Sequence, residues 1–282
     1  MKRRIHSVNE EKGYFSVVMN GVLVFIYLTK RQTKQFMDYL DVGNFVKMTL
    51  TDNTKVIDKR IAFKLNYFIS IERKTAKRTK VLYDLEEIRE DILTVLSNFD
   101  KYLFIDLEMT MPHYYKTPFV AEIVQVGYLL TNNNLTVIKE NDYYIKPTKY
   151  QQISKRTLHF LRVESHVFNN GKDYSHFYND LKEIIKTHNP KIIVWGNNDI
   201  ISLNKSYKIN EVKPLTKRQS FINLLDIHKI YYQLENDLGL FNAYKLYYGI
   251  NNNQEHDALD DAKVMLAVFK ALREKKETNE SF

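Results

Sequence analysis

The segment that most constrains the fold is residues 102–108, Tyr-Leu-Phe-Ile-Asp-Leu-Glu, an apolar run that gains two carboxylates where it ends. In a β-strand, successive side chains alternate between the two faces, so Asp106 and Glu108 project to the same side and can share one ligand. Two neighbouring carboxylates at the end of an apolar strand are unfavourable without a cation, and magnesium and manganese ions prefer carboxylate oxygens. The segment therefore predicts either a divalent metal site or an edge strand whose last residues are simply solvated.

Length and composition set the outer limits of what the chain can be. Its 282 residues suffice for one large domain or two ordinary ones. It contains no cysteine, which excludes disulfides, thiolate zinc sites and cysteine nucleophiles. No apolar run resembles a signal peptide or reaches the roughly 18 residues of a membrane span. We therefore expect a soluble cytoplasmic protein.

The positive charge of the chain is confined to its first part. Residues 1–83 hold 17 Lys and Arg against 7 Asp and Glu, whereas residues 84–282 hold 25 against 27. Such an asymmetry predicts a first domain that binds a polyanion and a second domain with another task. A basic surface that only maintains solubility would give the same counts.

The first part of the sequence is rich in short β-forming runs. Two of them, 13–19 and 22–27, flank Asn20-Gly21, the strongest short signal of a β-hairpin. The remaining elements we predict there are a helix over 33–40, strands over 45–50, 61–63, 67–71 and 81–83, and a turn at Asp52-Asn53. Several short strands at this spacing predict a small closed or nearly closed barrel.

Basic and aromatic residues alternate along this predicted barrel. Grooves that hold single-stranded nucleic acid combine cations for the phosphates with aromatic faces for the bases. The cations we expect to contact a strand are Lys30, Arg31, Lys59, Arg60, Arg73, Lys74, Lys77 and Arg78. The aromatic residues could equally form the barrel core, and the basic run over 73–80 could be a solvated loop.

From residue 84 the pattern changes to strands that alternate with helices. A helix over 84–98 starts with a capping-box pattern at Asp84 and Glu87, and we expect it to connect two domains. The later elements we predict are strands over 102–108, 121–130, 143–147 and 191–196, and helices over 173–187, 220–233, 239–248 and 258–273. The two β-rich runs on either side of residues 132–134 predict an antiparallel meander, and the apolar run over 191–196 predicts a buried central strand.

Three further polar residues fall where this sheet could bring them to the first carboxylates. Asp199 follows the predicted central strand, at the edge where open α/β sheets bind ligands, although it could also only cap the next helix. Asp261 lies on the apolar side of the last helix, whereas Asp260 does not. His256 precedes that helix, and from this loop it could act as a base that activates water or remain an inert surface residue.

Residues 106–108, Asp199 and the block 256–262, His-Asp-Ala-Leu-Asp-Asp-Ala, resemble the DEDDh 3′→5′ exonucleases of the ribonuclease H-like fold. With a histidine at position 256 and no tyrosine at 257, the block resembles the histidine branch of that family rather than its tyrosine branch. Residues 104–112 and 122–127 look particularly like KapD and ERI-type exonucleases. The resemblance covers about residues 101–273 and implies an α/β fold, a ribonuclease H-like mixed sheet flanked by helices. We expect a barrel resembling an OB or cold-shock module before it, with boundaries at 1–83, 84–98 and 99–282.

The resemblance also implies a role for each matching residue. Asp106 would bridge two Mg²⁺ or Mn²⁺ ions, Glu108 and Asp261 would complete the first site, and Asp199 would hold the second. His256 would accept a proton from the attacking water, and Met109 and Thr110 would contact the terminal nucleotide. The products would be nucleoside 5′-monophosphates.

The expected substrate is single-stranded nucleic acid, RNA rather than DNA, held by the barrel. A DNA-directed proofreading exonuclease and a non-catalytic nucleic-acid-binding adaptor are the alternatives.

Overall fold

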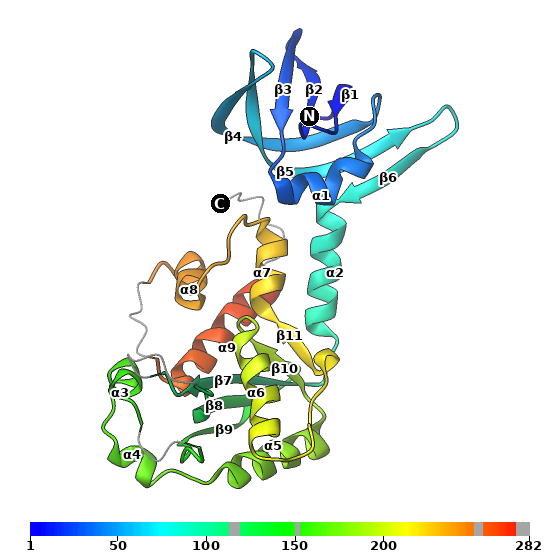
Figure 1. The fold of residues 1–282 in the computed structure, drawn as a ribbon. Helices are drawn as coiled ribbons and strands as arrows, with labels where there is room; N and C mark the ends of the chain where they lie inside the picture. The colour runs from blue at the N-terminus through cyan, green and yellow to red at the C-terminus, as the bar shows by residue number, and fades with distance from the viewer. Residues whose placement is uncertain (113–118, 150–152, 251–255, 275–282) are drawn as a thin grey trace. The chain divides into compact units, whose positions relative to one another are not determined.

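The computed structural model describes residues 1–112, 119–149, 153–250 and 256–274. The chain divides into two compact units, residues 1–91 (unit 1) and 92–282 (unit 2), and the division falls inside helix α2 (Leu85–Ser97). Each unit has its own sheet and its own apolar core, and Figure 1 labels their elements. Helix α2 corresponds closely to the helix predicted over 84–98.

Unit 1 is built on a small β-barrel, as the sequence predicts. Its strands are β1 (Arg3–Asn9), β2 (Tyr14–Met19), β3 (Val22–Tyr27), β4 (Phe45–Ile57), β5 (Arg60–Lys74) and β6 (Thr79–Asp84). The strand order is β3-β2-β1-β4-β5-β6, and a parallel pairing of β3 with β5 closes five of the strands into the barrel. Phe15, Phe68 and Ile26 lie fully buried in its core. The hairpin at Asn20-Gly21 is confirmed, with both residues at positive φ.

Several predicted boundaries in unit 1 are wrong. The polar residues 51–53 do not form a turn but a bulge within β4, because the register with β5 jumps from Leu50 opposite Leu65 to Thr54 opposite Phe63. The turn comes later, at Asp58 and Lys59, which both adopt positive φ. The two strands predicted over 61–63 and 67–71 are therefore one long strand, β5.

The start of unit 1 also differs from prediction. Strand β1 was not predicted, because only Ile5 among its residues is fully buried. Helix α1 (Lys30–Phe36) begins earlier than the predicted 33–40, because Thr29 and Gln32 form a capping box at its start. A short 3₁₀ helix, η1 (Met37–Tyr39), follows it.

Unit 2 contains a mixed five-stranded sheet with helices on both faces. Its strands are β7 (Lys101–Met109), β8 (Ile123–Asn132), β9 (Val137–Tyr144), β10 (Lys191–Val194) and β11 (Phe221–Asn223), in the order β11-β10-β7-β8-β9. Strand β7 lies at the centre, parallel to β10 and antiparallel to β8. This is the predicted ribonuclease H-like arrangement, and the predicted meander is formed by β8 and β9.

The two faces of β7 pack against different helices. Leu103, Ile105 and Leu107 share one core with α5 (Tyr174–His188) and α6 (Asn198–Ile209). Tyr102 and Phe104 share the other with α7 (Leu224–Tyr232), α8 (Leu240–Tyr248) and α9 (Ala258–Glu274). Because side chains alternate along a strand, Asp106 and Glu108 belong to the face of Phe104, on which α9 packs.

A few elements of unit 2 depart from prediction. Strand β9 covers 137–144 rather than 143–147, because its residues are mostly polar at the solvated edge of the sheet and give no apolar run. The short helices α3 (Lys155–Leu161) and α4 (His166–Asn169) were not predicted, and no bounds were predicted for the helix after the central strand, which is α6. The start of the helix predicted over 220–233 is strand β11, and α7 begins only at Leu224. Among the residues with a described placement, no helix has the length and apolar character to cross a membrane.

Candidate active site

Strand β7 places Asp106 and Glu108 at the carboxyl end of the sheet centre. Glu108 is buried, and Asp106 keeps part of its surface open to solvent. The parallel neighbour β10 ends beside them and leads into α6, whose first turn carries Asp199. The buried Asp199 carboxylate accepts a hydrogen bond of 3.1 Å from the Leu107 amide, between the two β7 carboxylates. Asp199 is therefore fixed against β7 itself, and Asn197 occupies the cap position of α6.

Asp261 reaches the same place from the first turn of α9. It is buried, whereas its neighbour Asp260 is exposed, as the helical pattern predicts. The approach of α9 depends on Gly127, which lies opposite Asp106 on β8. A Cβ at Gly127 would lie 2.1 Å from the Leu259 nitrogen, so only glycine admits the start of α9 this close to the sheet.

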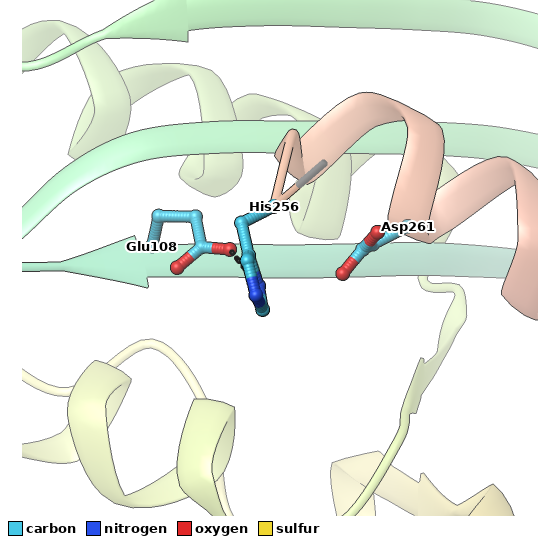
Figure 2. Close-up of side chains that lie close together, drawn as sticks. All are labelled: Glu108, His256 and Asp261. Carbon is cyan, nitrogen blue, oxygen red and sulfur yellow. Dashed lines mark ion pairs between the residues drawn. The ribbon is translucent and has the colours of Figure 1, made fainter. Parts of the chain in front are cut away.

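His256 lies directly before α9 with a positive φ of 55°, as expected for the loop that enters the helix. Its Nδ1 atom is 4.0 Å from Oε1 of Glu108. Glu108, His256 and Asp261 each offer one ligand atom, and these three atoms all lie within 4.8 Å of one another. Figure 2 shows the imidazole descending from the loop between the carboxylate of the strand and that of the helix.

The electrostatics of the four carboxylates fit a cation. We call Asp106, Glu108, Asp199 and Asp261 the carboxylate cluster. Burial, and then repulsion by Asp261 and Asp199, raises the pKa of Glu108 to about 8. Burial also raises the pKa of Asp106 and Asp199, with further repulsion inside the cluster. A bound cation relieves repulsion between carboxylates, and oxygen donors of this kind suit hard divalent cations.

Helix α3 supports His256 from the other side. The ring of Phe160 stacks on the imidazole, with ring centres 3.9 Å apart and planes 30° apart. Burial and the positive charge of Arg162 lower the pKa of His256. The imidazole is therefore neutral near pH 7 and able to accept a proton. Phe160, Arg162 and His256 also line an open hollow of about 650 Å³ beside the cluster.

Gln125 is a site residue that sequence reasoning missed. It lies opposite Glu108 on β8, fully buried, and its amide donates to Oδ2 of Asp257 at 2.9 Å. The other oxygen of Asp257 accepts from the amides of Leu259 and Asp260, which caps α9. Gln125 thus fixes the segment that carries both His256 and Asp261. The signal in the sequence is a polar side chain within the apolar run 123–130.

Met109 is the last residue of β7 and Thr110 follows it, so both lie close to Glu108 along the chain. Met109 is half-buried, and Thr110 is buried, with its hydroxyl accepting a 3.0 Å hydrogen bond from the Glu122 amide. The following residue, Met111, is held by Thr157 at the start of α3. Their contact with a terminal nucleotide stays a prediction.

The basic residues predicted to bind a strand lie at three places in unit 1. Lys30 and Arg31 begin α1, and Lys59 and Arg60 lie at the turn between β4 and β5. The rest gather at the opposite end of β5, where β5 turns into β6: Arg73, Lys74, Lys77 and Arg78. All eight are exposed, but Arg73 is paired with Asp41, and Lys74 and Arg60 lie over the rings of Phe45 and Phe25.

Comparison with known proteins places this site among nucleases. Residues 103–269 match the RNase_T family, described as "Exonuclease". A curated relative, "Probable 3'-5' exonuclease KapD" of Bacillus subtilis (strain 168), is 28% identical over 177 residues, which cover 62% of this chain and 85% of the relative.

Solved structures share the fold at lower identity. The nuclease domain of 3'hExo, a DEDDh family member bound to rAMP, has a TM-score of 0.56 at 18% identity, covering 66% of this chain and 99% of that one. Escherichia coli exonuclease I in complex with a 5cy-dT13 oligonucleotide has a TM-score of 0.52 at 18% identity, covering 64% and 42%. The family match lies within unit 2 and leaves unit 1 outside it.

Proposed function

This chain belongs to the RNase_T family of DEDDh 3′→5′ exonucleases, and we propose that it digests single-stranded RNA to nucleoside 5′-monophosphates with two Mg²⁺ or Mn²⁺ ions. The family implies divalent metal ions, and the carboxylate cluster is the group of residues that would hold them. The observation that carries the proposal is the convergence of Glu108, His256 and Asp261 from a strand, a loop and a helix on one point. A solvated strand end would not gather these groups.

Each residue of the site has a task that follows from its position. Asp199, Asp261 and Glu108 all act on the charge of Asp106, so it shares the field of the other three carboxylates. Asp106 would hold the ions together with Glu108, Asp261 and Asp199. When bound, the two ions would stabilise the attacking and leaving oxygens of phosphodiester hydrolysis.

His256 serves as the general base. Its imidazole is neutral at physiological pH, because burial and Arg162 lower its pKa. A ring nitrogen can therefore take the proton of the attacking water, while stacking on Phe160 keeps the ring in place. The hollow lined by Phe160 and Arg162 leaves room for the end of a strand beside this base.

The preference for RNA rests on the KapD and ERI-type motif of residues 104–112 and on a similar structure that concerns RNA. One similar structure concerns recognition of a histone mRNA stem-loop by a 3'-exonuclease, with a TM-score of 0.56 at 15% identity, covering 69% of this chain and 82% of that one. DNA is the alternative, since exonuclease I was solved with a DNA oligonucleotide.

Unit 1 holds the strand that unit 2 digests. The exposed cations of α1, of the β4–β5 turn and of the β5–β6 turn support this role, together with the basic excess of residues 1–83. Because the two units belong to one chain, binding by unit 1 would raise the concentration of 3′ ends around unit 2.

A time course with 5′-labelled RNA and DNA of equal sequence tests this proposal, using Mn²⁺ or Mg²⁺, chelator, and the His256→Ala variant. We expect a metal-dependent ladder that shortens from the 3′ end, faster on RNA, and lost in the variant. Equal rates on both substrates would contradict the RNA preference. A ladder that is unchanged in His256→Ala would contradict the role of the base.

A further inference from the structure

We propose that the outer face of strands β2 and β3 is a stacking platform on which unit 1 binds single-stranded nucleic acid. This face carries Tyr14, Phe25 and Tyr27, and we call it the aromatic face. The inference rests on the proposed role of unit 1 and assigns that role to particular residues. None of these three rings is needed to fill the barrel core, which is completed by their neighbours along each strand.

The alternation of side chains directs the three rings outward. Phe15, next to Tyr14 on β2, and Ile26, between Phe25 and Tyr27 on β3, are fully buried in the barrel. Tyr14 lies opposite Tyr27, and the rings of Tyr14 and Phe25 meet edge to face with centres 6.1 Å apart. All three are half-buried, so each ring is held in place while part of its surface remains open. Rings fixed in this way can receive bases at a small loss of side-chain entropy.

The two residues next to Phe25 in its row across the barrel have small side chains, and Lys55 follows opposite Ala62. Phe25 lies opposite Ser16 on one side and beside Ala62 on the other. Both small residues are buried, and no long side chain rises from either of them next to the ring. Ser16 and Ala62 therefore do not cover the Phe25 ring, and the side chain that lies over it is the exposed Arg60.

Cations lie directly over two of the rings. The Nζ atom of Lys55 is 4.0 Å from the centre of the Tyr27 ring, and the guanidinium carbon of Arg60 is 4.8 Å from that of Phe25. Both cations are exposed at the end of β4 and the start of β5. An exposed cation–π contact is worth only about 0.5–1 kcal/mol, so each cation can turn to a phosphate when a base takes its place on the ring. This pairing of rings with cations is what a single-strand groove requires.

Two carboxylates belong to the same region: Glu11 acts on the charge of Lys12, and Asp58 orients the region. Asp58 at the β4–β5 turn accepts from Lys12 at 2.5 Å and from the Tyr14 hydroxyl at 3.2 Å. These bonds join the β1–β2 turn to the β4–β5 turn and fix the direction of Tyr14. Lys12, Lys55, Lys59 and Arg60 outnumber these two acids around the rings. The charge of the face therefore complements a polyanion, and aromatic rings among the cations favour one that carries bases.

The test measures binding rather than digestion. Full-length protein carrying Asp106→Asn is kept in chelator with a 5′-fluorescein oligouridine of about 20 nucleotides, and anisotropy gives Kd at several salt concentrations. We expect Phe25→Leu with Tyr27→Leu to raise Kd about tenfold, because stacked bases lose their flat partners. Phe45→Leu is the matched control, since Phe45 is another half-buried ring of unit 1 with a lysine 4.5 Å above it. It should change Kd by less than about twofold.

A second variant keeps the test valid if the double leucine change disturbs folding. Lys55→Gln with Arg60→Gln alters only exposed side chains, and it should flatten the slope of log Kd against log salt by about 1.4, or about 0.7 for each lost phosphate contact. Unchanged Kd in the leucine variant and unchanged slope in the glutamine variant would overturn the proposal. The proposal would also be overturned if the parent protein, with the aromatic face unchanged, did not bind the oligonucleotide. Displacement of the oligonucleotide by an equally long polyglutamate, as effective as by unlabelled oligouridine, would overturn it as well.

The outcome is separate from that of the exonuclease proposal. If the wild-type chain digests RNA but the leucine variant binds as tightly as its parent, only the aromatic face is rejected. If binding depends on the aromatic face but no digestion occurs with metal, only the proposed hydrolysis is rejected.

Discussion

The two units treat charge in opposite ways. Unit 2 buries negative charge at one point, where Glu108, Asp199 and Asp261 all lie largely out of solvent. Unit 1 spreads positive charge over exposed side chains on a closed barrel. A buried charge needs a partner, so its position already indicates a cation site, whereas an exposed charge is stable in water without one. The burial of the carboxylates therefore says more about function than the larger number of cations does.

Outside the carboxylate cluster, the largest effect that would sharpen this comparison is expected at Gln125. In Gln125→Met, a side chain of similar size leaves Asp257 without its amide partner, so the segment bearing His256 and Asp261 is no longer fixed. We expect metal affinity or hydrolysis to fall about 10- to 100-fold, the usual result of losing support behind metal ligands. Titration with Mn²⁺ and single-turnover hydrolysis would measure it. Wild-type values in a folded variant would show that the cluster needs no such support.

In unit 1 a comparable loss requires several exposed cations to be removed together. Replacing Arg73, Lys74, Lys77 and Arg78 by Gln at the β5–β6 turn should weaken oligonucleotide binding about tenfold at low salt, and flatten the salt dependence by up to about 2.8. The melting temperature should stay close to that of the wild type, because these side chains are exposed. Anisotropy over a range of salt would check it, and an unchanged slope would place the phosphate contacts elsewhere.

Gly127 tests how closely the buried site is packed. Gly127→Ala places a methyl group against the backbone of Ala258 and Leu259, so helix α9 must move. Overpacking of this kind costs about 1–3 kcal/mol, which lowers the melting temperature by several degrees. Gly239→Ala is the control, because its nearest atom lies 3.7 Å away, the end of the Asn242 side chain. Equal melting temperatures for the two variants would contradict the close approach of α9.

The smallest effect is a link between pH and stability. The folded-state pKa of Glu108, about 8, lies above its ordinary value of 4.5. Its stabilising contribution is therefore fully present below about pH 4.5 and is lost as the pH rises toward 8. The metal-free protein should melt a few degrees lower at pH 8 than at pH 6, and Mn²⁺ should raise the melting temperature more at pH 8. Thermal scans with and without chelator would show this, and a metal-free melting temperature that rises with pH would contradict the crowding of the cluster.

The sequence predicted which residues of the candidate site lie together better than it predicted the element boundaries. Asp106, Glu108 and Asp261 could be assigned to one place because strand alternation and helix periodicity follow local rules. Gln125 and Gly127 could not, because their roles arise only when β8 meets the start of α9. The sequence predicts a turn where residues 51–53 form a bulge, because polar residues are typical of turns and of bulges alike. Only the pairing with β5 decides between the two. The outward direction of Phe25 could not be predicted, because one strand alone does not reveal which of its faces is buried.

The central claim is that burial turns one carboxylate of α9 into a metal ligand while its neighbour remains an ordinary surface group. The most direct test compares Asp261→Asn with Asp260→Asn, two identical changes at adjacent residues of the same helical turn. With Mn²⁺ and 5′-labelled RNA, Asp261→Asn should slow shortening from the 3′ end by about 10³-fold, since metal coordination contributes several kcal/mol to the reaction, and Asp260→Asn should match the wild type. Equal activity in the two variants would contradict the account.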